Sequence, residues 1–121
     1  MKYIKTVLVA VTIFSFLSFQ KTDSLVGKWE MFKMESPEGE VREMDGGKWM
    51  EFMKDGVLKG GNSLETTDRE GNWEYNAKTD EVTISFPKKR PGEGTFKVSW
   101  VDVKTIYVTI DKGIKIYMKR I

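Results

Sequence analysis

Apolar and polar residues alternate along most of the chain after Lys21. Such alternation is typical of strands that bury one face, and no stretch after Lys21 keeps apolar residues at helical spacing over three turns. Groups of Gly, Pro, Asn and Asp residues separate the alternating segments, as they separate strands that pair with their neighbours. The pattern predicts eight strands, at residues 25–35, 40–54, 57–66, 71–76, 81–86, 95–101, 105–110 and 114–118.

The connections between these segments carry clear turn signals. Asp55-Gly56 is the strongest of them, because a two-residue type I′ turn needs positive φ at both of its central positions. Gly46-Gly47 falls inside the long second segment, where two glycines allow the strand to bend. The prolines all fall in connections, where a missing N–H interrupts no ladder: Pro37, Pro87 and Pro91.

An even number of antiparallel strands joined by short connections can curl until the first strand pairs with the last. This closure removes both exposed edges of the sheet. With eight strands, the interior is either filled by side chains or holds one small ligand. We therefore predict an all-β fold, an antiparallel eight-stranded up-and-down barrel that follows an N-terminal signal helix.

The N-terminal segment has the features of an export signal. Lys2 and Lys5 precede the uncharged run Val7–Phe19. This run is shorter than the about 20 apolar residues that span a bilayer, and its length suits the apolar core of a secretory signal. We predict a cleaved signal peptide at residues 1–20, a barrel domain at residues 21–121, and a secreted or periplasmic protein with no stable membrane span after cleavage; an uncleaved anchor is the alternative.

Composition excludes several classes of function. Two of the 20 basic residues lie in the predicted signal, so the remaining basic residues equal the 18 acidic ones in number. A nucleic-acid partner is not expected, because such binders carry an excess of positive charge. The chain has no Cys and no His, which excludes disulfides, thiol catalysis, Cys/His zinc sites and a Ser-His-Asp relay. The acidic residues fall at turns and on outward faces, so we predict no enzyme.

Seven methionines raise the question of a copper site, because thioethers suit Cu(I). Met31 and Met34 are three residues apart, as Met50 and Met53 are. In a regular strand this spacing puts two side chains on opposite faces. We therefore expect the methionines to fill gaps in the core, and we predict no metal and no cofactor.

Four short motifs follow one another in a fixed order along the chain: an opening G-x-W, an F-x-x-D-G hairpin, a G-x-W in a middle strand, and a basic residue in the last strand. The residues that carry them are Gly27 and Trp29, then Phe52, Asp55 and Gly56, then Gly71 and Trp73, and finally Arg120. In these motifs the chain resembles the small lipocalin-like domains of exported bacterial proteins, which belong to the calycin group. The resemblance covers the chain from Leu25 to Ile121.

The resemblance implies how one end of the barrel is closed. In the family, the first-strand Trp packs across the closed end beneath a basic side chain from the final strand. Here this role falls to Gly27, Trp29 and Arg120, and Lys119 is expected to face solvent. An Arg over the face of a Trp gains about 0.5–2 kcal/mol of cation–π attraction. This cluster is expected to be structural.

Alternation also identifies the side chains that face the barrel interior. They are candidates to line a pocket for a small hydrophobic ligand, and the alternative is that they simply fill the core. In the second case the barrel would be a structural or protein-interaction module of the cell envelope, with a protein partner. The candidates are Met31, Met50, Phe52, Trp73, Tyr75, Ile84, Phe86, Phe96, Val98, Trp100, Ile106, Val108, Ile116 and Met118.

Two features lie outside this interior set. Trp49 has the opposite parity to Met50, so we expect it outside the barrel or at its rim, where an exposed Trp would mark a contact surface. Lys88-Lys89-Arg90 is a basic cluster in the loop before the sixth strand, which is either a solvated loop or a site for an anionic ligand.

Overall fold

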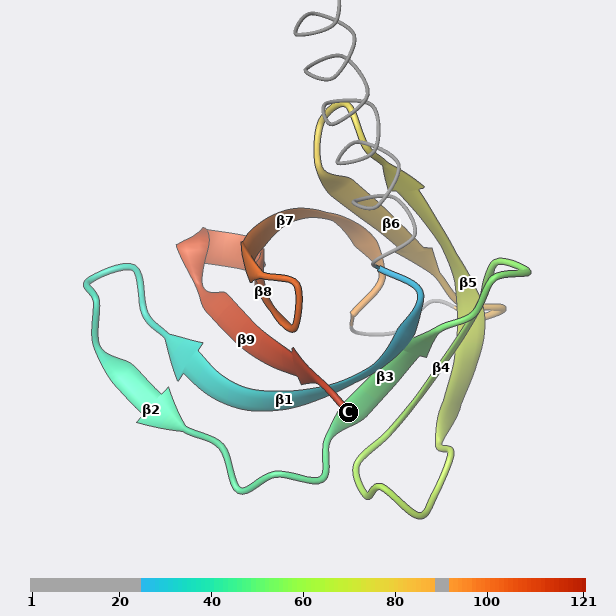
Figure 1. Ribbon diagram of the computed structural model, residues 1–121, viewed down its shortest axis with the longest axis horizontal. Coiled ribbons are helices and arrows are strands. Elements are labelled where there is room, and N and C mark those ends of the chain that lie inside the picture. The colour runs from blue at the N-terminus through green and yellow to red at the C-terminus, as the bar shows by residue number, and fades with distance from the viewer. Residues whose placement is uncertain (1–24, 89–91) are drawn as a thin grey trace, which may run out of the picture.

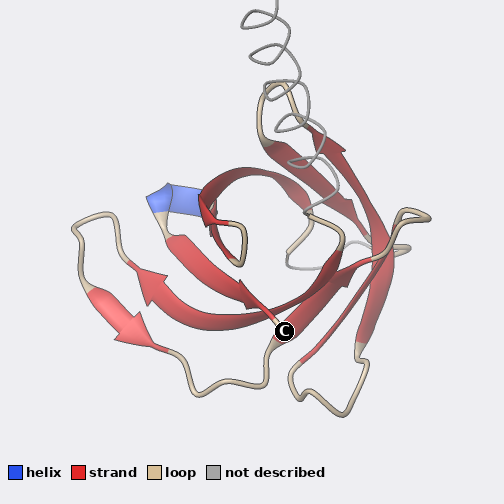
Figure 2. Ribbon diagram, in the orientation of Figure 1, coloured by secondary structure: helices blue, strands red, loops and turns tan. Residues whose placement is uncertain are grey.

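The computed structural model describes residues 25–88 and 92–121, and nearly all of its regular structure is strand (Figure 2). One short 3-10 helix, η1, covers Asp111–Gly113. The strands are β1 (Gly27–Glu35), β2 (Val41–Glu43), β3 (Trp49–Phe52), β4 (Val57–Gly61), β5 (Arg69–Asn76), β6 (Glu81–Ser85), β7 (Gly94–Asp102), β8 (Thr105–Thr109) and β9 (Lys115–Arg120).

The strands form one antiparallel sheet that closes on itself. From β3 to β9 each strand pairs with its neighbours in sequence, and β1 pairs with both β3 and β9. Strands β1 and β3–β9 thus make a closed eight-stranded barrel, seen as a ring in Figure 1. The predicted all-β up-and-down barrel is confirmed; the predicted signal at residues 1–20 lies outside the described residues.

The predicted strand at residues 40–54 is split into β2 and β3. Both parts pair with β1, β2 at Lys33–Glu35 and β3 at Gly27–Glu30. The break between them contains Gly46 and Gly47, whose φ angles are +88° and +89°. Since these positive angles do not fit a regular strand, the two glycines interrupt the strand completely. β2 therefore lies beside β1 without being one of the barrel strands.

Register places one set of alternating side chains inside the barrel. Trp29 lies opposite Arg120 and Met31 opposite Met118 across the β1–β9 closure. Directly paired residues of antiparallel strands share a face, so parity can be followed around the ring. The fully buried side chains belong to this inner set or to the residues just before β1, and the largest are Trp29, Phe52, Leu25, Ile106, Met118, Val82 and Val98.

The two ends of the barrel differ. We call the end that holds Trp29 and Arg120 the closed end; the β3–β4, β5–β6 and β7–β8 turns lie there. The opposite, open end carries the β4–β5 and β6–β7 connections and η1. Among the described residues, no helix has the length and apolar character needed to cross a membrane.

Candidate ligand cavity at the open end of the barrel

The closed end is sealed by Trp29 and Arg120. Trp29 is 0% exposed, and its indole Nε1 donates a hydrogen bond to the Leu25 carbonyl at 3.0 Å. Arg120 Cζ lies 4.2 Å from the centroid of a Trp29 ring, so the contact predicted between these two residues is present. Arg120 Nη1 also donates to the Val26 carbonyl at 2.9 Å, and burial lowers the pKa of the guanidinium. Lys119 is exposed on the outer face.

The backbone conformation and surroundings of Gly27 show why the opening motif has a glycine at this position. Its φ is +139°, a conformation that L side chains rarely adopt. A Cβ at this position would lie 2.6 Å from Arg120 Nη1. Only glycine therefore leaves the room in which the guanidinium reaches the Trp29 ring.

A second layer of aromatic side chains packs above this seal. Trp100 meets Trp29 edge to face, with ring centroids 6.1 Å apart, and Trp100 Nε1 donates to the Tyr75 hydroxyl at 3.3 Å. The Tyr75 hydroxyl donates in turn to Asp80 Oδ1 at 2.6 Å. Burial first, and then the hydrogen bond to Asp80, raises the pKa of Tyr75 to about 12. Trp73 packs edge to face on Phe52, with ring centroids 5.1 Å apart, and donates from Nε1 to the Met53 carbonyl at 2.9 Å.

A cavity of about 450 Å³ occupies the other part of the interior. Eight of the fourteen candidate residues line it: Met31, Met50, Phe52, Ile84, Phe96, Val108, Ile116 and Met118. The remaining six are not part of its lining. Trp73, Tyr75 and Trp100 pack as just described, and Val98 and Ile106 are buried core residues.

Phe86, the sixth of these residues, packs over Gly71. A Cβ at Gly71 would lie 2.7 Å from Phe86 Cδ1 and would clash with the Ser85 carbonyl oxygen. The glycine of the G-x-W motif at residues 71–73 thus makes room for an aromatic ring. Phe86 lines a separate pocket of about 40 Å³ beside the main cavity.

Several lining residues were not among the candidates. Val82 and Ile110 share the parity of Ile84 and Val108, so alternation alone could have identified them. The mouth is completed by Gly92, Glu93, Gly94, Thr95 and Asp111, which come from connections and strand ends that periodicity does not orient.

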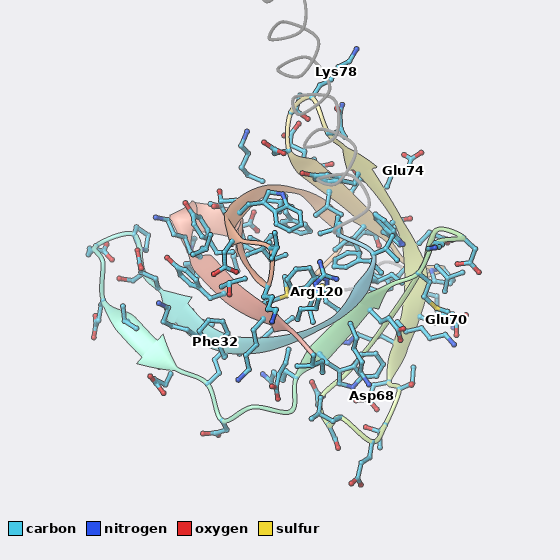
Figure 3. All side chains as sticks on the ribbon, in the orientation of Figure 1. Phe32, Asp68, Glu70, Glu74, Lys78 and Arg120 are labelled. Carbon is cyan, nitrogen blue, oxygen red and sulfur yellow. The ribbon has the colours of Figure 1, made fainter. Side chains whose placement is uncertain are left out.

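Arg69 is the lining residue that sequence reasoning missed most completely. Arg69 lies in the segment 67–70, which has the composition of a turn. In the structure, however, β5 begins at Arg69, and the Cα of Arg69 lies opposite that of Gly60. This register puts Arg69 on the same face as Trp73 and Tyr75. In Figure 3, Glu70 and Glu74 of the same strand point away from the barrel, as alternation requires.

The mouth carries charges of both signs. Arg69 is half-buried, and its Nη2 donates to Asn62 Oδ1 at a long 3.5 Å. Within the described part of the chain, Arg69 forms no ion pair. Glu93 and Asp111 also line the mouth, and both side chains are exposed.

Trp49 is not the exposed rim residue that its parity suggested. It lies on the outer face of the barrel wall, as expected, but only 4% of it is exposed. Its Nε1 donates to the carbonyls of Ser63 at 2.6 Å and Thr66 at 3.2 Å, so the β4–β5 connection folds over the ring. Gly61 lies opposite Trp49, and a Cβ there would come within 2.8 Å of Trp49 Nε1. The expectation of an exposed contact surface at Trp49 was wrong.

The placement of Met31 and Met34 also differs from the prediction. A bulge between Met31 and Lys33 shifts the register, so that Met31 pairs with Met118 and Met34 with Ile116. Both methionines therefore share the inner face, where regular alternation would have separated them. Among the described residues, no group of three or more acidic side chains is placed to hold a metal ion.

Comparison with known proteins adds no assignment: no protein-family model matches the chain, and no curated protein is significantly similar to it in sequence.

Proposed function

We propose that this is an exported, non-catalytic protein of lipocalin-like type that binds a small apolar molecule inside its barrel. The observation that carries the proposal is the cavity itself. Its volume of about 450 Å³ lies in the range of about 300–1,000 Å³ that small-molecule sites occupy. A barrel that served only as a scaffold would have no need of this space.

The chemistry of the wall supports an apolar ligand. Below the mouth, the lining consists of aliphatic, aromatic and thioether side chains. Three methionines contribute to it, Met31, Met50 and Met118. Methionine side chains are flexible and polarizable, so this wall can adapt to an elongated or irregular molecule. Each methylene group that a ligand buries here would contribute about 0.8 kcal/mol.

The closed end supports the lipocalin-like character. The seal by Gly27, Trp29 and Arg120 has the arrangement that the family resemblance implies. The absence of catalysis is supported by the sequence, because acid–base chemistry would have to rely on carboxylates, lysines or tyrosines alone. Of these, Tyr75 keeps its proton because its pKa is raised to about 12, and its hydroxyl donates a hydrogen bond to Asp80.

The test is binding of an uncharged fluorescent probe, N-phenyl-1-naphthylamine, to residues 21–121. The wild type should enhance its fluorescence saturably. Ile116→Trp should abolish this enhancement, because a large ring would occupy the cavity that Ile116 lines. Val101→Trp is the matched control, since Val101 is 55% exposed on the outer face of β7 and should leave binding unchanged.

No enhancement with the wild type would favour the alternative, a structural or protein-interaction module of the cell envelope. Equal enhancement with wild type and Ile116→Trp would place the probe elsewhere on the protein. Either result would contradict the proposed function.

A further inference from the structure

We propose that the ligand is an amphiphile with a carboxylate head group, and that Arg69 binds this head group at the mouth of the cavity. The inference rests on the proposed function and specifies the chemistry of its ligand. It is carried by the position of one guanidinium at the boundary between an apolar interior and solvent.

Arg69 is unusual for the face on which it lies. Along the described barrel strands, the inward-facing positions are otherwise apolar or glycine, apart from Tyr75 and Arg120 at the closed end. Arg120 is held by the Trp29 ring and the Val26 carbonyl. Arg69 lines both the main cavity and the smaller pocket next to Phe86.

The contacts of Arg69 leave much of its donor capacity unused. A guanidinium has five N–H donors, and the hydrogen bond of Arg69 within the described chain is the long one to Asn62. Gly60, its partner across the strands, presents no side chain that could accept a hydrogen bond. A half-buried cation with few partners gains most from an anion that brings its own oxygens.

A carboxylate is an anionic head group that fits this position. Its two oxygens match the planar fork of a guanidinium in bidentate geometry. With the head group at Arg69, an apolar tail would extend toward Met31, Phe52 and Ile84 in the same cavity.

The two acidic residues at the mouth act in the opposite sense. Glu93 and Asp111 would repel an anionic head group and attract a cationic one. Both side chains are exposed, so water and salt screen their charges more than the charge of half-buried Arg69. We therefore expect the attraction between Arg69 and a carboxylate to dominate. Binding of an alkyl amine measures the opposite effect, the attraction of a cationic head group by Glu93 and Asp111.

The experiment compares decanoate, decanol and decylamine as competitors of N-phenyl-1-naphthylamine. Wild type should bind decanoate about tenfold or more tightly than decanol, as expected for a charge-assisted hydrogen bond. Arg69→Gln should remove this preference while it retains decanol binding, which also shows that the variant is folded. Arg42→Gln removes the same charge from exposed β2, and should retain the preference.

Three results would overturn the inference. The first is an unchanged ratio of decanoate affinity to decanol affinity in Arg69→Gln. The second is an equal loss of the preference for decanoate in Arg42→Gln. The third is tighter binding of decylamine than of decanoate by the wild type. Each of these leaves the proposed function intact, because the uncharged probe still binds. Failure of the probe and of decanol to bind at all would instead remove the proposed function, and the inference with it.

Discussion

Replacement of Trp29 tests the seal at the closed end of the barrel. Trp29 is completely buried, supports Arg120 on one ring face, meets the Trp100 ring edge to face, and satisfies the Leu25 carbonyl. Trp29→Ala removes all of these contacts and leaves a cavity. Substitutions of this kind cost about 3–5 kcal/mol. A domain of this size has a free energy of unfolding of about 5–15 kcal/mol, so the loss would be a large fraction of its stability.

Trp29→Phe separates two contributions to this loss. It keeps an aromatic ring for Arg120 and Trp100 but loses the N–H that donates to Leu25. An unsatisfied buried carbonyl costs about 1–3 kcal/mol, so Trp29→Phe should be destabilised less than Trp29→Ala. Val103→Ala is the control, because Val103 is 67% exposed and its truncation should change stability by at most about 0.5 kcal/mol.

The assay is equilibrium unfolding in urea, followed by tryptophan fluorescence and by circular dichroism. Agreement of the two signals establishes two-state behaviour, which the comparison of free energies requires. A Trp29→Ala variant that unfolds at the same urea concentration as the wild type would refute the structural role of this residue. So would equal destabilisation by Trp29→Ala and Val103→Ala.

Three further predictions concern single residues. Gly27→Ala should be destabilised in urea, because its Cβ would displace the Arg120 guanidinium and its φ is unfavourable; an unchanged midpoint would contradict the close approach. Trp49→Phe should lose about 1–3 kcal/mol in the same assay, since two carbonyls of the β4–β5 connection lose their donor, and no loss would argue against that connection covering the ring. The raised pKa of Tyr75 means that folding favours its neutral form. The stability that Tyr75 contributes is therefore fully present below about pH 10 and is lost toward pH 12, so wild type should lose stability more steeply than Tyr75→Phe over this interval.

The fold could be predicted from the sequence because its signals are local. Alternation with a period of two identifies the inward side chains, and Asp55-Gly56 and the other turn signals divide the chain into neighbouring strands. Closure between β1 and β9 then follows from the need to protect two sheet edges. The contact between Trp29 and Arg120 was instead expected from the family resemblance, and it is present in the structure.

The lining of the cavity could be predicted only in part. Alternation predicts on which face of a strand a side chain lies, but not how far along the barrel axis it lies. Trp73, Tyr75 and Trp100 have inward parity, but their rings pack on Phe52, Asp80 and Trp29 and do not line the cavity. The bulge after Met31 reversed the expected parity of Met34. Bulges and strand starts depend on pairing across the sheet, which no local pattern specifies.

Arg69 and Trp49 show how tertiary contacts override local composition. Residues 67–70 contain polar residues typical of a turn, yet pairing with Gly60 begins β5 at Arg69 and directs this side chain inward. Trp49 has outward parity, but Gly61 and the β4–β5 connection provide it with a buried site. For Trp49, the space is left by Gly61 on the neighbouring strand, where a Cβ would lie 2.8 Å from Trp49 Nε1.

The central claim, that an apolar ligand occupies the barrel interior, is tested most directly by NMR of the methionine methyl groups. Met31, Met50 and Met118 line the cavity, whereas Met44 and Met53 lie in the connections before β3 and β4. With methyl-labelled protein titrated with decanol, we predict saturable shifts at Met31, Met50 and Met118 and none at Met44 and Met53. Unchanged signals from the three cavity methionines, or shifts confined to Met44 and Met53, would contradict the account.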